Sequence, residues 1–216
     1  MSDRVPASGL GCELLTNLRL FNRKERYFLV GLALDNQRFR LGSGFRQQLE
    51  AELGLCIPVD AYAAMDYHLD WLYASLFLAQ QPDCRAVFDN KDELVSANQE
   101  DADFLVAYRE GEQHHLVLVE AKASTAFTNS QLRSKAKRLR AIFGEAGDRW
   151  PGVTPHFVLA SPRQPQRLEL AEWPAWMLSA GKVAWIRLPM PEGLVSVTRC
   201  DSHGAMTSEG GCWKVY

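Results

Sequence analysis

Two short apolar runs separated by a polar turn form the most regular hydrophobic pattern in this chain. Residues 104–108 and 116–119 are rich in strand-forming side chains, and Gly111 lies in the polar segment between them. The pattern predicts a β-hairpin with its turn at the glycine. Because both runs are too apolar for surface strands, we expect the hairpin to lie in the core.

The register of this hairpin brings charged side chains together. With a two-residue loop at 111–112, counting back from the turn puts Asp103 directly opposite Glu120, and a longer loop or a bulge shifts the pairing by about one residue. Glu120 and Lys122 share a face of the strand, because side chains alternate. Two opposed carboxylates repel each other, and a divalent cation between them removes the repulsion. Such oxygen ligands suit Mg²⁺ or Mn²⁺.

At these residues the chain resembles the PD-(D/E)XK nuclease superfamily. Its motif is an Asp that opens one strand, followed by Glu-x-Lys on the next. Asp103, Glu120 and Lys122 match these positions, and Ala102 stands where the motif has proline. The matched core covers roughly residues 60–160. The resemblance implies an α/β fold of the restriction-endonuclease-like class, with a mixed central sheet flanked by helices. It also implies hydrolysis of DNA with Mg²⁺ or Mn²⁺ bound by Asp103 and Glu120, and Lys122 as a catalytic residue.

The longest helix is predicted over residues 60–80, ahead of Pro82. Its apolar stripe has i, i+3, i+4 spacing and consists of Leu69, Leu72, Tyr73, Leu76 and Phe77. Asp66 and Asp70 lie one turn apart on this helix. Many members of the superfamily add an acidic residue from the helix that precedes the core strands, which implies Asp70, or else Asp66, as a further metal ligand. The alternative is that both are solvated charges.

A basic helix is predicted over residues 131–143, with Asn129 or Ser130 as its cap and Gly144 at its end. Its basic residues are Arg133, Lys135, Lys137, Arg138 and Arg140, with no acidic residue among them. Beside a nuclease site such a face would bind phosphates, and we expect Arg133, Lys135, Lys137 and Arg138 to contact nucleic acid. An ordinary solvated face is the alternative. The resemblance further implies that Gln131 and Lys135 join the site.

The whole chain divides into a helical N-terminal extension, residues 1–59, and a nuclease-like α/β core, residues 60–216. Its length predicts that the two form one compact domain. Residues 1–12 are expected to be loose. Helices are predicted over 23–34, with a capping box of Asn22 and Glu25, and over 45–53, closed by Gly54. Further predicted elements are strands at 93–98, 154–160 and 183–188, a helix that starts at 168, and a terminal antiparallel pair at 194–198 and 213–216.

Composition limits the remaining choices. The net charge of −2 means that any surface for nucleic acid must be local. Five cysteines without Cys-x-x-Cys spacing argue against a zinc site or a disulfide framework and favour a reducing, cytoplasmic compartment. No apolar run reaches the length of a membrane span, so no membrane partner is expected.

Three functions remain open at this point. The first is a Mg²⁺-dependent DNA endonuclease, which would act as a homodimer where it cuts both strands. The second is a non-catalytic module that binds nucleic acid or protein through a vestigial nuclease-like fold. The third is an unrelated α/β protein in which Glu120 and Lys122 form an ordinary surface pair.

Overall fold

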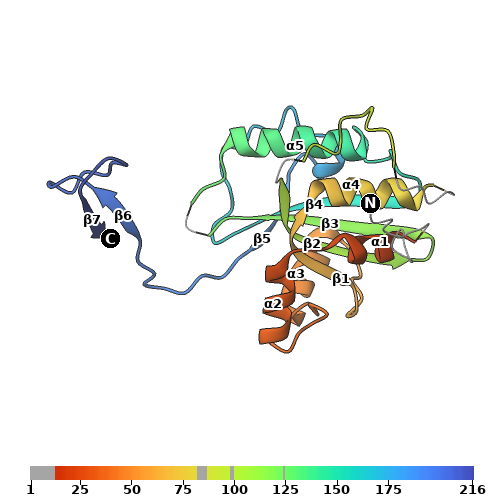
Figure 1. Ribbon diagram of the computed structural model, residues 1–216, viewed down its shortest axis with the longest axis horizontal. Helices are drawn as coiled ribbons and strands as arrows, with labels where there is room; N and C mark the ends of the chain where they lie inside the picture. The colour runs from red at the N-terminus through yellow and green to blue at the C-terminus, as the bar shows by residue number, and fades with distance from the viewer. Residues whose placement is uncertain (1–12, 82–86, 98–99, 124) are drawn as a thin grey trace, which may run out of the picture.

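The computed structural model in Figure 1 describes residues 13–81, 87–97, 100–123 and 125–216, and its centre is a five-stranded sheet. The strands lie in chain order across the sheet: β1 (Tyr62–His68), β2 (Asp101–Glu110), β3 (Gln113–Ala121), β4 (Val153–Ser161) and β5 (Ala184–Arg187). β1, β2 and β3 pair antiparallel, whereas β3, β4 and β5 run parallel. The fold is therefore mixed α/β with a mixed sheet, as the sequence predicted.

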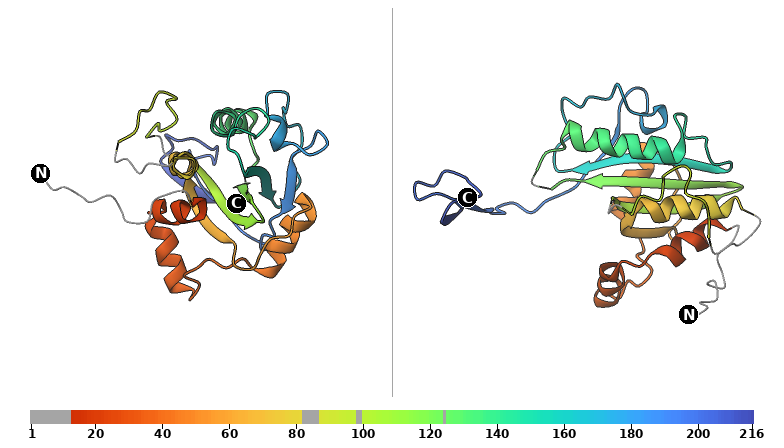
Figure 2. Two further views of the ribbon diagram at one scale, coloured as in Figure 1. Left: turned by 90° about the vertical axis from the view of Figure 1, so that its right-hand side faces the viewer. Right: turned by 45° about the horizontal axis from the view of Figure 1, so that its top comes forward.

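Helices cover both faces of this sheet. They are α1 (Leu14–Phe21), α2 (Glu25–Ala33), α3 (Ser43–Leu53), α4 (Leu69–Ala79) and α5 (Asn129–Phe143), with a short 3₁₀ helix η1 (Ala175–Met177). α1, α4 and α5 pack against one face and α3 against the other (Figure 2). α5 is the crossover between the parallel strands β3 and β4, a connection that requires a dozen or more residues.

The central strands bury both of their faces. Leu105, Leu116, Leu118 and Leu159 face α4 and α5 in one core. Val106, Val117, Val119 and Val158 face α3 in the other. Burial on both sides explains why these strands read as continuous apolar runs in the sequence.

Most of the predicted elements are present. The hairpin, the helices at α2, α3 and α5, and the strands at β4 and β5 are confirmed within a few residues. The terminal antiparallel pair is also confirmed, as β6 (Val197–Cys200) with β7 (Cys212–Val215). This pair stands away from the main sheet at the end of an extended connection (Figure 1).

The predicted helix over residues 60–80 is wrong in its first half. Residues 62–68 form strand β1, paired with β2, and only the second half is helical, as α4. Ala63, Ala64 and Met65 favour helices by intrinsic propensity, and the pairing with β2 overrides that preference. Because Tyr62, Ala63 and Ala64 are all buried, no alternating pattern signals the strand.

Three further predictions fail. The described part of 93–98 is not a strand: Glu93 and Ala97 have positive φ angles of 54° and 57°. No helix begins at 168, and only η1 forms there, after Pro174. The capping box at α2 is absent, since Lys24 is the N-cap and makes no side-chain capping bond.

One helix, α1, has no sequence prediction. Its N-cap is Glu13, whose carboxylate accepts hydrogen bonds from the backbone N–H groups of Leu15 and Thr16. Glutamate is not among the preferred N-cap residues, so this helix start carries no strong signal. Residues 1–12, expected to be loose, lie outside the described part of the chain.

None of the helices in the described ranges combines the length and apolar character that crossing a bilayer requires.

Candidate active site

The β2–β3 hairpin has the register that its sequence predicts. Gly111 and Glu112 form the two-residue turn, with Gly111 at a φ of 57°, and the ladder runs from the turn to the pair Phe104 and Val119. Asp103 and Glu120 occupy the next row. The Asp103 carboxylate accepts a hydrogen bond of 2.7 Å from the backbone N–H of Ala121.

Asp66 belongs to the same row on the neighbouring strand. Met65 pairs with Phe104 and Tyr67 with Ala102, so Asp66 lies across from Asp103. Its φ of 48° is in the left-handed region, which turns its side chain away from the regular strand direction. The guanidinium of Arg26 lies 3.0 Å from its Oδ2 atom.

Glu120 is a buried carboxylate with a cation beside it. Its side chain is 15% exposed, and the Nζ atom of Lys135 lies 3.3 Å from its Oε2 atom. The pKa of Glu120 is raised because burial disfavours the charged form; the Lys135 ammonium opposes this shift, Asp103 adds to it, and Lys122 opposes it. The structure thus brings all three motif residues into one electrostatic neighbourhood.

Lys135 lies inside this neighbourhood and not on the solvent face of α5. Its ammonium group donates to the backbone carbonyl of Asp101 and lies 4.0 Å from Glu100 Oε1, in addition to its contact with Glu120. Asp101 in turn accepts a 2.6 Å hydrogen bond from Lys24 on its Oδ2 atom. Its Oδ1 atom is buried and has no hydrogen-bond partner among the residues that the structure describes.

Glu100 and Asp101 are therefore residues of this site that sequence reasoning did not select. Alternation along β2 puts Asp101 on the same face as Asp103, which is the one signal that points to it. Lys24 comes from a position 77 residues earlier in the chain, and no local pattern predicts that contact.

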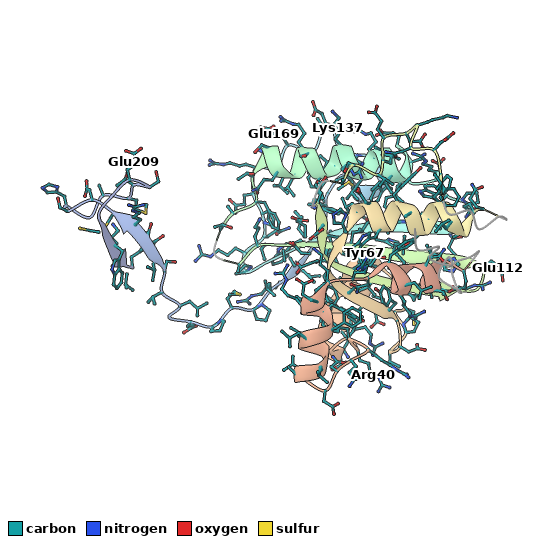
Figure 3. The ribbon with its side chains drawn as sticks, viewed as in Figure 1. Arg40, Tyr67, Glu112, Lys137, Glu169 and Glu209 are labelled. Atoms are coloured by element: carbon teal, nitrogen blue, oxygen red, sulfur yellow. The ribbon has the colours of Figure 1, made fainter. Side chains whose placement is uncertain are left out.

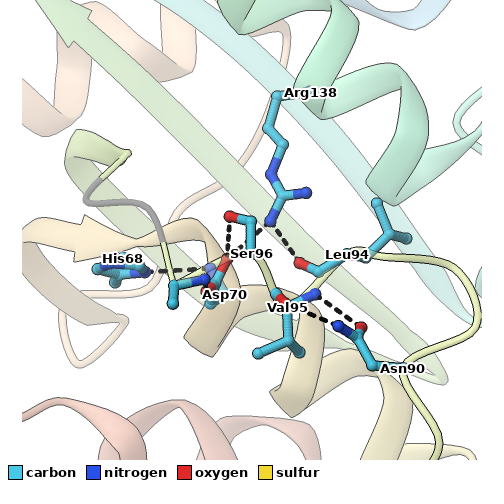
Figure 4. Close-up of polar contacts among 8 residues, drawn as sticks. His68, Asp70, Asn90, Leu94, Val95, Ser96 and Arg138 are labelled. Atoms are coloured by element: carbon cyan, nitrogen blue, oxygen red, sulfur yellow. Dashed lines mark hydrogen bonds and ion pairs between the residues drawn. The ribbon is translucent and has the colours of Figure 1, made fainter.

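Asp70 and Arg138 are joined to each other by an ion pair of 2.7 Å (Figure 4). The Asp70 carboxylate also accepts hydrogen bonds from the Ser96 hydroxyl at 3.2 Å and from the Ala97 N–H at 2.8 Å. Arg138 additionally donates to the carbonyl of Leu94. Asp70, the predicted third metal ligand, and Arg138, a predicted phosphate contact, thus tie the loop before β2 to α4 and α5.

The other predicted residues of α5, namely Gln131, Arg133 and Lys137, lie at the surface of the protein. Arg133 is half exposed and pairs with Glu169 at 2.6 Å and Glu172 at 3.2 Å. Lys137 is exposed on the outer side of α5 (Figure 3). Gln131 is exposed in the first turn, where its backbone N–H donates to the N-cap Thr128 at 3.4 Å.

The donor set at Asp103 and Glu120 is suited to a hard divalent cation. Among the described residues, no group of three or more His, Cys, Asp or Glu side chains is arranged to hold a metal ion. Mg²⁺ usually takes only one or two protein carboxylates and completes its shell with water and substrate phosphates. Asp103 and Glu120 match that number of carboxylates, and a cation beside Glu120 would oppose the effect of burial that raises its pKa.

A second titratable cluster crosses the sheet between β2 and β4. His115 stacks on Tyr108, and its Nδ1 atom lies 3.1 Å from the Nε2 atom of His156. Burial lowers the pKa of His156 to about 4, and the neighbouring His115 adds to this effect. The pKa of His115 is also lowered by burial, which Glu110 opposes.

Acid is expected to destabilise the fold through His156. The unfolded chain takes up a proton near pH 6.5 and the folded chain only near pH 4, so the free energy of unfolding falls by about 3 kcal/mol as the pH drops between these values. Urea unfolding at several pH values measures this fall. His156→Phe should flatten the curve in that window, whereas His203→Gln, on the exposed terminal hairpin, should leave it unchanged. An equally steep curve for His156→Phe would contradict the assignment.

Searches of protein-family models, curated proteins and solved structures find no match to this chain.

Proposed function

We propose that this chain is a metal-dependent nuclease of the PD-(D/E)XK type that hydrolyses phosphodiester bonds in DNA. The observation that carries the proposal is the row of Asp103 and Glu120 at the end of a buried hairpin, with Lys122 directly after the end of β3. A carboxylate pair held next to a lysine is suited to bind a divalent cation and a phosphate together.

Each residue of this row has a distinct role in the proposed reaction. Asp103 and Glu120 hold Mg²⁺ or Mn²⁺, which when bound supplies an activated water and neutralises charge on the phosphate. Lys122 orients the attacking water and stabilises the negative charge that develops on the phosphate oxygens. The oxygen of water bonds to phosphorus, one P–O ester bond breaks, and the proton that the water loses is balanced by the proton that the departing oxygen takes up.

Replacing Lys122 by alanine is expected to lower the cleavage rate about 100- to 1,000-fold, as for the loss of one group that stabilises transition-state charge. Lys122 is half-buried at the end of its strand, and its backbone N–H still donates to Ala160, at 2.9 Å in the wild type. The melting temperature should therefore change little. The measurement is cleavage of plasmid, linear duplex, single-stranded and branched DNA, and RNA, each with Mg²⁺ and with Mn²⁺.

Lys137→Ala is the matched control, because Lys137 is a solvent-exposed lysine on α5. It should reduce the rate only a few-fold, through weaker substrate binding. A Lys122→Ala protein that cleaves as fast as wild type would reject the proposed role. Chelation of the metal should stop cleavage in every variant.

A non-catalytic binding module is the second candidate, and one contact favours it. The Lys135 ammonium lies 3.3 Å from Glu120 and already supplies a positive charge where a metal would do so. A vestigial site of this kind would not bind Mn²⁺ in a manner that depends on Asp103 and Glu120. Titration of Mn²⁺ into wild type, Asp103→Asn and Glu120→Gln separates the two candidates when no substrate is cleaved.

The proposed function also has consequences for the oligomeric state and the cellular compartment of the protein. A single-site nuclease needs two copies to cut both strands of a duplex, so we propose a homodimer on duplex substrate. Five scattered cysteines, without a metal-binding spacing, support a reducing, cytoplasmic setting.

A further inference from the structure

A cavity of about 500 Å³ opens between α1, α2, the loop after α2 and the start of β1. Tyr27 and Tyr62 are buried residues of its wall, and the exposed residues Arg19, Arg38 and Arg40 also line it; these three arginines are called its rim below. Its volume lies within the usual range for small-ligand sites. None of the proposed metal ligands lines it, so it is a second location on the molecule.

The loop that carries two of these arginines is fixed on both sides. The Asn36 side chain accepts a 2.8 Å hydrogen bond from the N–H of Arg40 and donates to its carbonyl at 3.3 Å. The Phe39 ring stacks on Tyr27 with centroids 4.3 Å apart. Gly31 permits this close approach, because a Cβ there would lie 3.3 Å from both the Phe39 ring and the Asn36 carbonyl.

Phe39 itself adopts a conformation that aromatic residues rarely take. Its φ of 47° is left-handed, which for a bulky side chain requires support from the surrounding structure. With the Phe39 ring held against Tyr27, its two neighbours Arg38 and Arg40 both line the cavity. Arg40 is seen at the lower edge of the molecule in Figure 3.

The charge of this rim is largely uncompensated. In the described ranges, no ion pair joins Arg19, Arg38 or Arg40 to a carboxylate. The Arg19 guanidinium instead lies over the ring of Tyr62, 5.4 Å from its centroid. Asp60 is the single acidic residue of the lining. Several arginines that line one cavity favour phosphate, which guanidinium groups bind through paired hydrogen bonds.

An exposed aromatic ring also lines the cavity. Phe28 is 57% exposed, lines the cavity, and makes an edge-to-face contact with Tyr27 at 5.2 Å. A ring held in this way offers a surface on which a nucleobase stacks. We propose that this cavity binds a nucleoside phosphate, either free or within a single strand of nucleic acid. The proposal does not depend on hydrolysis at Asp103 and Glu120.

Binding can be measured without cleavage. Fluorescence anisotropy of a labelled single-stranded oligonucleotide in EDTA, over a range of salt concentrations, reports affinity and the number of phosphates contacted. Arg38→Gln combined with Arg40→Gln should weaken binding at least tenfold. The number of phosphate contacts calculated from the salt dependence should fall by about two. Phe28→Ala should weaken it about tenfold through lost stacking. Asp60→Asn should strengthen it, because a repelling charge is removed.

Arg23→Gln is the control for general charge, since Arg23 is exposed near this cavity but does not line it. It should change affinity less than threefold. Competition with a nucleoside monophosphate and with inorganic phosphate identifies the source: release by the monophosphate indicates a free nucleotide, and resistance to it indicates a strand. The proposal is overturned if wild type binds neither oligonucleotide nor nucleotide, if Arg23→Gln weakens binding as much as the double variant, or if inorganic phosphate competes as well as the nucleotide.

Discussion

Glu120→Gln is expected to raise the melting temperature at neutral pH and, under the proposed function, to lower cleavage by 100-fold or more. The pKa of Glu120 is raised by burial, so its stabilising contribution is complete below the pKa of the unfolded chain and is lost as the pH rises through the folded value. Above that folded value the wild type holds a buried charge that Lys135 offsets only in part. The neutral amide removes that charge and also removes one of the two proposed metal ligands. In the variant the Lys135 ammonium keeps its hydrogen bond to the Asp101 carbonyl, so it is not left without a partner.

Thermal unfolding at pH 7 and pH 4 measures this effect. The difference between Glu120→Gln and wild type should shrink at pH 4, because the wild-type carboxyl group takes up a proton there. Glu112→Gln is the control: Glu112 lies on the exposed hairpin turn, with a side chain 96% exposed, and its replacement should leave the melting temperature unchanged (Figure 3). A lower melting temperature for Glu120→Gln at pH 7 would contradict the argument.

The melting temperatures of wild type and Glu120→Gln in the presence of Mn²⁺ also test whether the site binds a metal. A cation that binds only the folded state raises the melting temperature in proportion to the logarithm of its concentration. Wild type should respond and Glu120→Gln should not. A wild type without any response would leave the binding module as the better description.

Asp70→Ala is expected to destabilise the fold by about 3–5 kcal/mol, the usual result of leaving one partner of a buried ion pair alone. The side chains of Asp70 and Arg138 are only 9% and 13% exposed. Their contacts with Ser96 and Leu94 also hold the loop before β2. Urea unfolding measures the loss of stability directly.

Arg133→Gln is the matched control on the same helix. Arg133 forms its ion pairs at the surface, and the loss should be below about 1 kcal/mol. Under our interpretation, the folded fraction of Asp70→Ala retains its affinity for Mn²⁺. A folded Asp70→Ala protein that no longer binds Mn²⁺ would instead make Asp70 a metal ligand.

Local patterns were sufficient to predict the geometry of the hairpin. Alternation fixes which side chains share a face, and a two-residue turn at Gly111 fixes the register, so the neighbourhood of Asp103 and Glu120 follows from sequence spacing alone. Helix α5 is predicted by local patterns as well, because its apolar residues recur at helical spacing and Gly144 ends it.

Long-range contacts were beyond such patterns. Periodicity gives no indication that Arg138 pairs with Asp70, 68 residues away, or that Lys135 turns inward to Glu120. It shows which side of a helix is polar but not which carboxylates lie beneath it, and only the resemblance implies that Lys135 joins the site. Strand β1 was missed because its alanines favour helix and both of its faces are buried.

The two-residue turn at Gly111 and Glu112 has a consequence for how this protein tolerates changes in length. β3 is paired on both sides, antiparallel to β2 and parallel to β4. One inserted residue at the turn cannot slide β3 along β2 without also breaking its register with β4, and such a slip would turn Glu120 to the opposite face. Replacing Gly111 strains the turn, because its φ of 57° is left-handed. An insertion that slips the register at this distant end of the hairpin would act as a mutation of the acidic row itself.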